Sequence, residues 1–395
     1  MWKIEEIKQK QEYVRERLNH CTDPKEKEKL ELSLITYNEL LSNSGTLRYT
    51  RIPNLLDKLT KDNFSNKKEK DLARLEVELF FGDVAYFNDE YLNFLLQLCD
   101  RVSEREVPEL DETLFVPMVV TKKSLIELSK KFYTSLQDEE ILELANKVLN
   151  DESSMNFSHI ARRGRSDCKG LTLNDYIFDK SYINVTSQNN IFDYQIFNHE
   201  VMHGIDFYMR KKVPSENYYG FHEVPTYTID YLFLDYLEEN GLDPNQVQML
   251  RCQKDNYLHL LATLTKTQIR SQLIREYGVK NSKNPSMDQI RKILTVELKK
   301  QLLEIQSGIM AYGLKEQIRE NKKIGISHLK QFMRNTIPKD QTPDFSYIGL
   351  SNDELLKYSE QIGNYSMQSQ DHGIIKLAIR YIWRYQDEYK SNCSC

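Results

Sequence analysis

The chain has 395 residues, with 54 Lys and Arg against 59 Asp and Glu, which leaves a formal net charge of −5 at pH 7. This near balance excludes the strongly basic surface typical of nucleic-acid binding and the polybasic patch of a membrane-surface protein. Gly (14) and Pro (10) together make up about half their usual share, which disfavours turn-rich sandwiches, propellers and short-strand solenoids. Long helices are therefore expected.

Hydropathy and cysteine usage bear on where the protein works. No window approaches the roughly 18 apolar residues that span a bilayer, although 40% of the residues are hydrophobic. The chain starts Met1-Trp2-Lys3-Ile4-Glu5-Glu6 and lacks the apolar stretch of a secretory signal. The six cysteines are scattered without C-x-x-C pairs, as expected for reduced thiols. These features predict a cytoplasmic protein with small or peptide-sized partners, and no nucleic-acid or membrane partner.

The first hundred residues have the spacing of amphipathic helices. Apolar residues recur at intervals of three and four in residues 1–42, with a break at Thr22-Asp23-Pro24, and again in residues 69–100. The composition changes around Val107-Pro108-Glu109, which is the best candidate for a boundary. We therefore expect an N-terminal helical lobe over residues 1–106, joined in one structural unit with the rest.

The remainder, residues 107–395, is also mostly helical. Helix is predicted from Lys123 to Leu149, and residues 155–190 are the most strand-like part of the chain, with the β-branched run Tyr182-Ile183-Asn184-Val185-Thr186. From Phe192 the helical pattern continues almost to the end, with interruptions at 211–221, 278–285 and 337–350. The expected fold class is mainly α, with one small β-sheet just before the helix that begins near residue 192.

That helix contains His199-Glu200-Val201-Met202-His203. Residues four apart project from one face of a helix, so His199 and His203 can bind one metal ion. Glu200 lies beside the first histidine and can reach a metal-bound water as a general base, its role in H-E-x-x-H peptidases. The alternative is a solvated face with two surface histidines. It fits poorly, because apolar neighbours indicate a buried helix: Ile196, Phe197, Val201, Met202, Ile205, Phe207 and Tyr208.

A catalytic zinc site needs a third protein ligand, which should lie downstream. A second helix is expected to begin near Glu223, 20 residues after His203, and the carboxylate of Glu223 can meet the histidines across the helix pair. His222 is the competing ligand, and a simple first-turn charge is the structural alternative for Glu223. Asp230 lies seven residues after Glu223, two turns along the same face, where it can orient a ligand from behind.

These motifs resemble the thimet oligopeptidase and oligoendopeptidase F family of zinc metallopeptidases. In that family H-E-x-G-H is followed by a helix starting E-V-P-S or E-V-A-S, and Glu223-Val224-Pro225-Thr226 is similar in order and chemistry. The resemblance spans roughly residues 110–350. It implies two helical lobes flanking a deep channel, a catalytic lobe over residues 107–395, and one Zn²⁺ per chain bound by His199, His203 and Glu223.

The resemblance also implies the reaction. The chain is expected to be a zinc metalloendopeptidase that hydrolyses short oligopeptides, with a zinc-bound water activated by Glu200. Asp230 stands where the family has a second acid. Asn184, on what we expect to be an edge strand, is a candidate to align an extended peptide by strand addition.

One departure from the family leaves a second function open. Relatives carry a histidine and several tyrosines, donors to the oxyanion, in a stretch that corresponds here to residues 297–306, which contain neither Tyr nor His. Tyr312, Tyr277 and Tyr365 are possible substitutes. The alternative is a catalytically impaired relative that serves as a peptide- or partner-binding helical module, and a weaker one is a metallopeptidase toxin.

Overall fold

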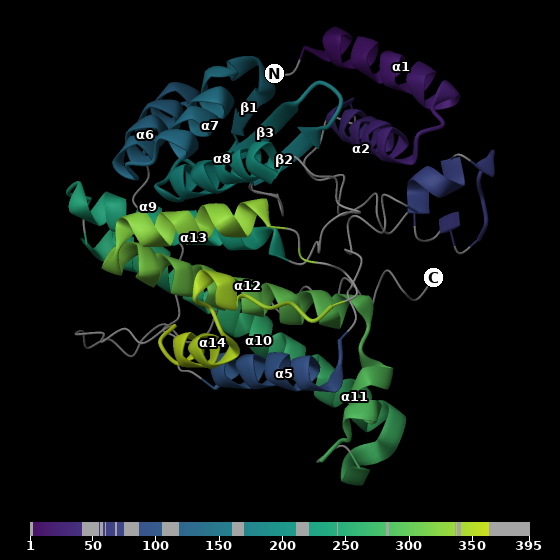
Figure 1. The fold of residues 1–395 in the computed structure, drawn as a ribbon, viewed down its shortest axis with the longest axis vertical. Coiled ribbons are helices and arrows are strands. Elements are labelled where there is room, and N and C mark those ends of the chain that lie inside the picture. The colour runs from purple at the N-terminus through teal and green to yellow at the C-terminus, as the bar shows by residue number, and fades with distance from the viewer. Residues whose placement is uncertain are drawn as a thin grey trace.

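The structure is a computed structural model that describes residues 3–41, 55, 58–59, 61–67, 69–74, 87–104, 118–159, 170–210, 221–242, 244–281, 284–335, 337 and 341–362. Over these residues the chain is mainly helical with one three-stranded sheet, which precedes the helix carrying His199 and His203 (Figure 1). The predicted fold class is therefore confirmed. The channel between two lobes stays a prediction.

The bounds of the elements follow the chain. The helices are α1 (Ile4–His20), α2 (Pro24–Leu41), α5 (Asp89–Ser103), α6 (Lys122–Ser135), α7 (Glu139–Asn150), α8 (Phe192–Arg210), α9 (Glu223–Glu239), α10 (Pro244–Asn281), α11 (Met287–Ile293), α12 (Val296–Glu320), α13 (Lys322–Arg334) and α14 (Asn352–Ser359). The strands are β1 (Met155–His159), β2 (Gly170–Asp175) and β3 (Lys180–Ser187), and short 3-10 turns are η2 (Glu152–Ser154) and η5 (Ser346–Ile348).

The helices α8, α9, α12 and α10 are stacked in layers on one face of the sheet (Figure 1). α8 packs on β2 and β3, α9 packs on α8, α12 packs on α9, and α10 packs against both α9 and α12. α6 and α7 pack on α8 as well. α7 comes close at Gly204, where an added Cβ would lie only 3.0 Å from a methyl of Val148. Because these neighbours pack on α8, several of its polar residues are buried along with its apolar ones: Asp193, Gln195, Asn198, Glu200 and Asp206.

The sheet has the strand order β1-β3-β2. β1 is parallel to β3, with Asn156 opposite Asn184, and β2 is antiparallel to β3, with Leu171 opposite Asn184. The expectation that Asn184 lies on an edge strand is therefore wrong, because β3 is the central strand. The β-branched run suits that place, since Ile183 and Val185 are fully buried. Strand addition of a peptide at Asn184 is ruled out by the two ladders.

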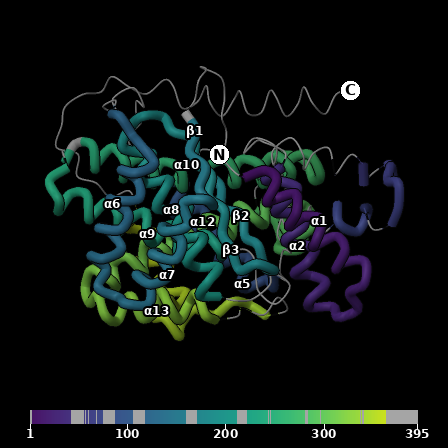
Figure 2. The backbone as a smooth tube through the Cα atoms, turned by 90° about the horizontal axis from the view of Figure 1, so that it is seen from above, coloured from purple at the N-terminus to yellow at the C-terminus, as the bar shows by residue number. Residues whose placement is uncertain are grey.

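The N-terminal segments join two different parts of the molecule. α1 and α2 lie beside β2, on the side of the sheet away from α6 and α7 (Figure 2). They share a small core with Leu173 and Tyr182 of the sheet. α5 instead packs on α10, α12 and α14 and belongs to the main core. The predicted boundary between residues 106 and 107 lies outside the described residues.

Two predicted helices differ from those in the structure, one by a break and the other by its bounds. The helix expected from Lys123 to Leu149 is two helices, α6 and α7, because Gln137 adopts a left-handed backbone with φ 58°. Asp138 then begins α7 by accepting a hydrogen bond from the backbone N–H of Ile141 at 3.0 Å. The helix expected over residues 69–100 lies partly outside the described residues, and α5 begins only at Asp89, after the capping residue Asn88.

Among the residues that the structure describes, no helix is both long and apolar enough to cross a bilayer. The described cysteines, Cys21, Cys99 and Cys252, carry free thiols, as the sequence predicts.

A buried carboxylate attaches α2 to the sheet. Asp175, fully buried at the end of β2, accepts hydrogen bonds from the Tyr37 hydroxyl and from Ser33 Oγ at 3.0 Å. We expect Tyr37→Phe to lower the free energy of unfolding by about 1–3 kcal/mol, because it removes a hydrogen bond to a buried charged group. Urea unfolding followed by circular dichroism measures the change. Tyr13→Phe, at a tyrosine that is 45% exposed, is the matched control and should change stability by less than about 0.5 kcal/mol.

Candidate metal centre

A buried aspartate fixes the start of the helix that carries the two histidines. Asp193 accepts hydrogen bonds from the backbone N–H groups of Gln188 and Asn189, both at 2.8 Å, and from Ser187 Oγ at 2.6 Å. These bonds close the turn from β3 into α8. One turn apart on that helix, the rings of His199 and His203 have centroids 4.9 Å from each other. The predicted convergence of the two imidazoles is therefore present.

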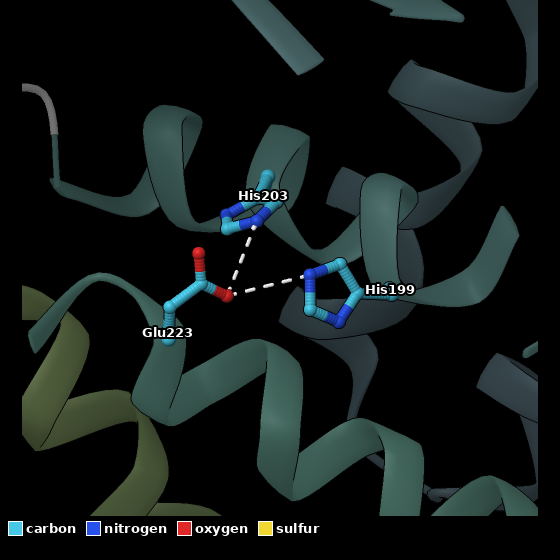
Figure 3. A group of neighbouring side chains, drawn as sticks. All are labelled: His199, His203 and Glu223. Carbon is cyan, nitrogen blue, oxygen red and sulfur yellow. Dashed lines mark ion pairs between the residues drawn. The ribbon is translucent and has the colours of Figure 1, made fainter. Parts of the chain in front are cut away.

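The first turn of α9 brings Glu223 to the same place (Figure 3). Its Oε2 lies 3.3 Å from His199 Nε2 and 3.6 Å from His203 Nε2. One ligand atom from each residue lies within 4.8 Å of the others. Tetrahedral zinc at about 2.0–2.1 Å from its ligands separates neighbouring ligand atoms by about 3.3 Å. The three residues therefore fit a zinc ion in both chemistry and spacing.

The competing ligand His222 takes a different position. Its Nε2 lies 3.0 Å from Oε1 of Glu223, the oxygen that does not face His199 and His203. Oε2 of Glu223 also accepts a hydrogen bond from Thr226 Oγ1 at 2.9 Å. These contacts orient the Glu223 carboxylate, so the geometry favours Glu223 as the third ligand.

Asp230 lies behind His199, as the sequence predicts. Its Oδ2 is 3.1 Å from His199 Nδ1. In the neutral form of the ring, a carboxylate at Nδ1 favours a proton on that nitrogen, which would leave the Nε2 lone pair available to a cation. Asp230 thus contacts the nitrogen of His199 that faces away from Glu223.

The cluster has the electrostatics of a cation site. Burial lowers the pKa of His199, but the facing carboxylates of Asp230 and Glu223 outweigh burial and raise it to about 10. Burial lowers the pKa of His203 to about 3. Burial also acts to raise the pKa of Glu223, yet interactions with the neighbouring histidines His203, His222 and His199 hold it well below its usual range. Two carboxylates therefore enclose one imidazolium, whose positive charge a divalent cation can replace.

Glu200 points to the sheet side of α8. It is 6% exposed, and its Oε2 accepts a hydrogen bond from Thr172 Oγ1 of β2 at 2.7 Å. Gly170 makes room for it, because an added Cβ there would lie 2.4 Å from Glu200 Oε1. Burial raises the pKa of Glu200 to about 7, although His199 and the Thr172 hydroxyl oppose the shift. A carboxylate with this pKa is suited to exchange protons near neutral pH.

The other residues named from the sequence are not gathered at the cluster. The side chain of Asn184 accepts a hydrogen bond from Asn156 Nδ2 at 2.6 Å, within the sheet. Tyr312 packs edge-on to Tyr231, and Tyr277 packs in a small core with Ile269 and Leu273. Tyr365 lies outside the described residues.

Sequence reasoning missed two tyrosines that come from other helices. The Tyr227 ring lies 5.9 Å from the His199 ring, and its hydroxyl donates to Glu304 Oε1 at 3.1 Å. The Tyr257 hydroxyl donates to the same oxygen. Glu304 lies in the stretch 297–306, so α9 and α10 supply hydroxyl groups to a segment that has none of its own. The position of Tyr227, one turn after Glu223, was the available signal.

Comparisons with known proteins find likeness only in structure. No family model and no curated protein matches the sequence. A Bacillus anthracis chain assigned to oligoendopeptidase F is 13% identical, with a TM-score of 0.46, and the match covers 83% of this chain and 62% of that one. The corresponding values for Pz peptidase A with an inhibitor are 14%, 0.44, 86% and 69%. For a peptidase from Chlamydophila abortus they are 12%, 0.42, 90% and 62%.

These structures include the family that the motifs resemble. The chain spans less than two thirds of the length of the Bacillus anthracis protein. At such identities and TM-scores the likeness carries no argument about activity, so the functional case rests on the residues of the cluster.

The cluster predicts how the protein exchanges zinc for protons. At pH 7.5, binding of one zinc per chain should release about one proton, because His199 must lose its proton to become a ligand. The affinity is therefore expected to rise with pH between about pH 6 and 9. Titration calorimetry in buffers of different ionisation enthalpy measures both quantities. Zinc binding without proton release would contradict the charge assignment.

His203→Ala provides the complementary test of the ligand set. Loss of a ligand should weaken zinc binding more strongly than a change outside the ligand shell, which typically lowers the affinity about 10–100-fold. The matched control is His328→Ala, at a histidine on α13 whose Nδ1 contacts Gln317 Oε1 at 2.8 Å, and it should bind zinc like the wild type.

Proposed function

We propose that the chain is a zinc-dependent metalloendopeptidase that hydrolyses peptide bonds in short peptides. The observation that carries the proposal is the convergence of His199 Nε2, His203 Nε2 and Glu223 Oε2, with Glu200 next to the first histidine on the same helix. Two imidazoles and one carboxylate are a ligand set typical of catalytic zinc. The buried carboxyl of Glu200 is the general base that peptide hydrolysis requires.

The roles of the residues follow from their positions. His199, His203 and Glu223 would hold the ion, and Asp230 would keep Nε2 of His199 available to it. The chemistry that zinc supplies when bound is polarisation of the scissile carbonyl and a lower pKa of the attacking water. Glu200 would act as the general base, taking up a proton on its carboxylate and returning it to the leaving amine, while Thr172 holds the carboxylate in place.

The alternative function, a catalytically impaired peptide- or partner-binding module, was motivated by residues 297–306, which lack Tyr and His. Tyr227 and Tyr257 contact Glu304 within this stretch, so hydroxyl donors stand there although the local sequence has none. The Tyr227 ring also lies 5.9 Å from the His199 ring, so one of these tyrosines stands beside the cluster. This arrangement supports the peptidase over the binding module.

Replacement of Glu200 tests the proposal directly. Glu200→Gln should lower kcat/KM for peptide cleavage by about 10²–10⁴-fold, because the amide cannot take up a proton. Zinc content should stay at one per chain. A peptide library of graded lengths, incubated with zinc-loaded protein and read by mass spectrometry, gives both cleavage and length preference. Glu127→Gln, at an exposed glutamate of α6, is the control and should cleave like the wild type. Undiminished cleavage by the Glu200→Gln variant would contradict the assignment of Glu200 as the general base.

Gly170 offers a second test, of the position of Glu200. In Gly170→Ala the new methyl would overlap Glu200 Oε1 and Cγ, at 2.4 and 2.8 Å, and displace the carboxylate. We expect kcat/KM to fall by about 10²-fold, as for a misplacement of about 1 Å, and zinc affinity to change little.

The control for this variant is Gly313→Ala, at a glycine of α12 where the methyl would press on Leu350 and Tyr358 at 2.8 Å. It should lower stability and leave kcat/KM unchanged. Equal activity losses in the two variants would mean that the Gly170 effect is general destabilisation.

A further inference from the structure

A buried lysine stands behind the candidate metal centre. Lys254, on α10, is 9% exposed, and its Nζ lies 2.5 Å from Oδ2 of Asp230. The ammonium also lies 3.4 Å from the centre of the Tyr227 ring, which gives it a cation–π contact. Lysine is rarely buried to this extent without a partner, and here the partner is Asp230.

The carboxylate oxygen that Lys254 contacts is the one that faces the metal ligand. Oδ2 of Asp230 lies 3.1 Å from His199 Nδ1, whereas the buried Oδ1 has no hydrogen-bond partner among the described residues. One oxygen therefore carries both contacts. Lys254, Asp230 and His199 form a chain across α10, α9 and α8 that ends at Nε2 of His199, 3.3 Å from Glu223 Oε2.

We propose that Lys254 is a positioning residue of this metal centre, acting through Asp230 on the orientation of the His199 ring. The proposal rests on the proposed zinc site and adds a residue to it. The ammonium compensates the charge of a carboxylate buried at 4% exposure and holds its Oδ2 between α8 and α10. Among the described residues, no other group contacts Oδ2 of Asp230 besides His199. Removal of the ammonium is therefore expected to loosen the contact between Oδ2 and Nδ1 and to weaken zinc binding by His199.

The competing interpretation is an ion pair that only joins α9 to α10. Such a pair would affect the stability of the fold and leave zinc affinity alone. The affinity of the folded protein for zinc therefore distinguishes the two roles. Competition with a chromophoric chelator measures this affinity, and the free energy of unfolding is measured in parallel.

Lys254→Met removes the charge and keeps most of the side-chain length. We expect it to bind zinc about 10–100-fold more weakly than the wild type. The chain offers a matched control in Lys315, which is 8% exposed, pairs with Glu316 at 2.6 Å and lies 5.2 Å from the centre of the Tyr312 ring. Lys315→Met should stay within about twofold of wild-type affinity.

A double-mutant cycle tests whether Lys254 acts through Asp230. If it does, Asp230→Asn combined with Lys254→Met binds zinc no more weakly than Asp230→Asn alone, since the shared oxygen is already changed. Additive losses, or wild-type affinity in Lys254→Met, overturn the proposal.

If Lys254→Met does not fold, Lys254→Arg replaces it. The wider guanidinium displaces the contact with Oδ2, so a measurable loss of affinity supports the proposal and unchanged affinity overturns it.

The same titrations keep the two proposals apart. A wild-type chain that binds no stoichiometric zinc removes the metal centre and, with it, the role of Lys254. A wild-type chain that binds zinc, together with a Lys254→Met variant of equal affinity, removes the role of Lys254 alone and leaves the zinc site standing.

Discussion

Burial of several ionisable groups between α8 and α9 is the constraint on which the site depends. Two imidazoles and two carboxylates lie there with little exposure to water, and buried charges persist only where opposite charges face them. A proton on His199 and the ammonium of Lys254 meet this requirement from the protein itself. A divalent cation meets it better, because it attracts three ligands at once. Burial of these groups would therefore cost free energy in a purely structural core, whereas a bound cation would offset that cost.

The scaffold around α8 serves to keep this arrangement rigid. The sheet covers one face of the helix, α7 approaches closely at Gly204, and α9 lies along the opposite side. Two of these neighbours contribute a group that contacts the site, Thr172 from β2 and Asp230 from α9. Side chains held on regular elements keep their geometry more precisely than side chains on loops. The proposed chemistry therefore draws on most layers of the molecule.

The candidate ligands and the supporting acid on α8 and α9 were predictable, and the groups contributed by β2 and α10 were not. The spacing of His199 and His203 follows from 3.6 residues per turn, which local sequence determines. Thr172, Lys254 and Tyr257 come from elements whose packing no periodicity reveals. Asn184 shows the same limit in the sheet, because a β-branched run does not distinguish a central strand from an edge strand. The break at Gln137 was missed since its left-handed backbone has no glycine to mark it.

Strand β2 has a consequence for how distant parts of the protein communicate. At one end Asp175 is bonded to Tyr37 and Ser33 of α2, and three residues earlier Thr172 holds Glu200. A strand is stiff along its length, so a shift at one end is carried to the other. Strand β2 therefore joins the N-terminal helix pair to the proposed general base. Four residues of strand backbone, Thr172 to Asp175, thus connect the bonds that hold α2 to the bond that holds Glu200.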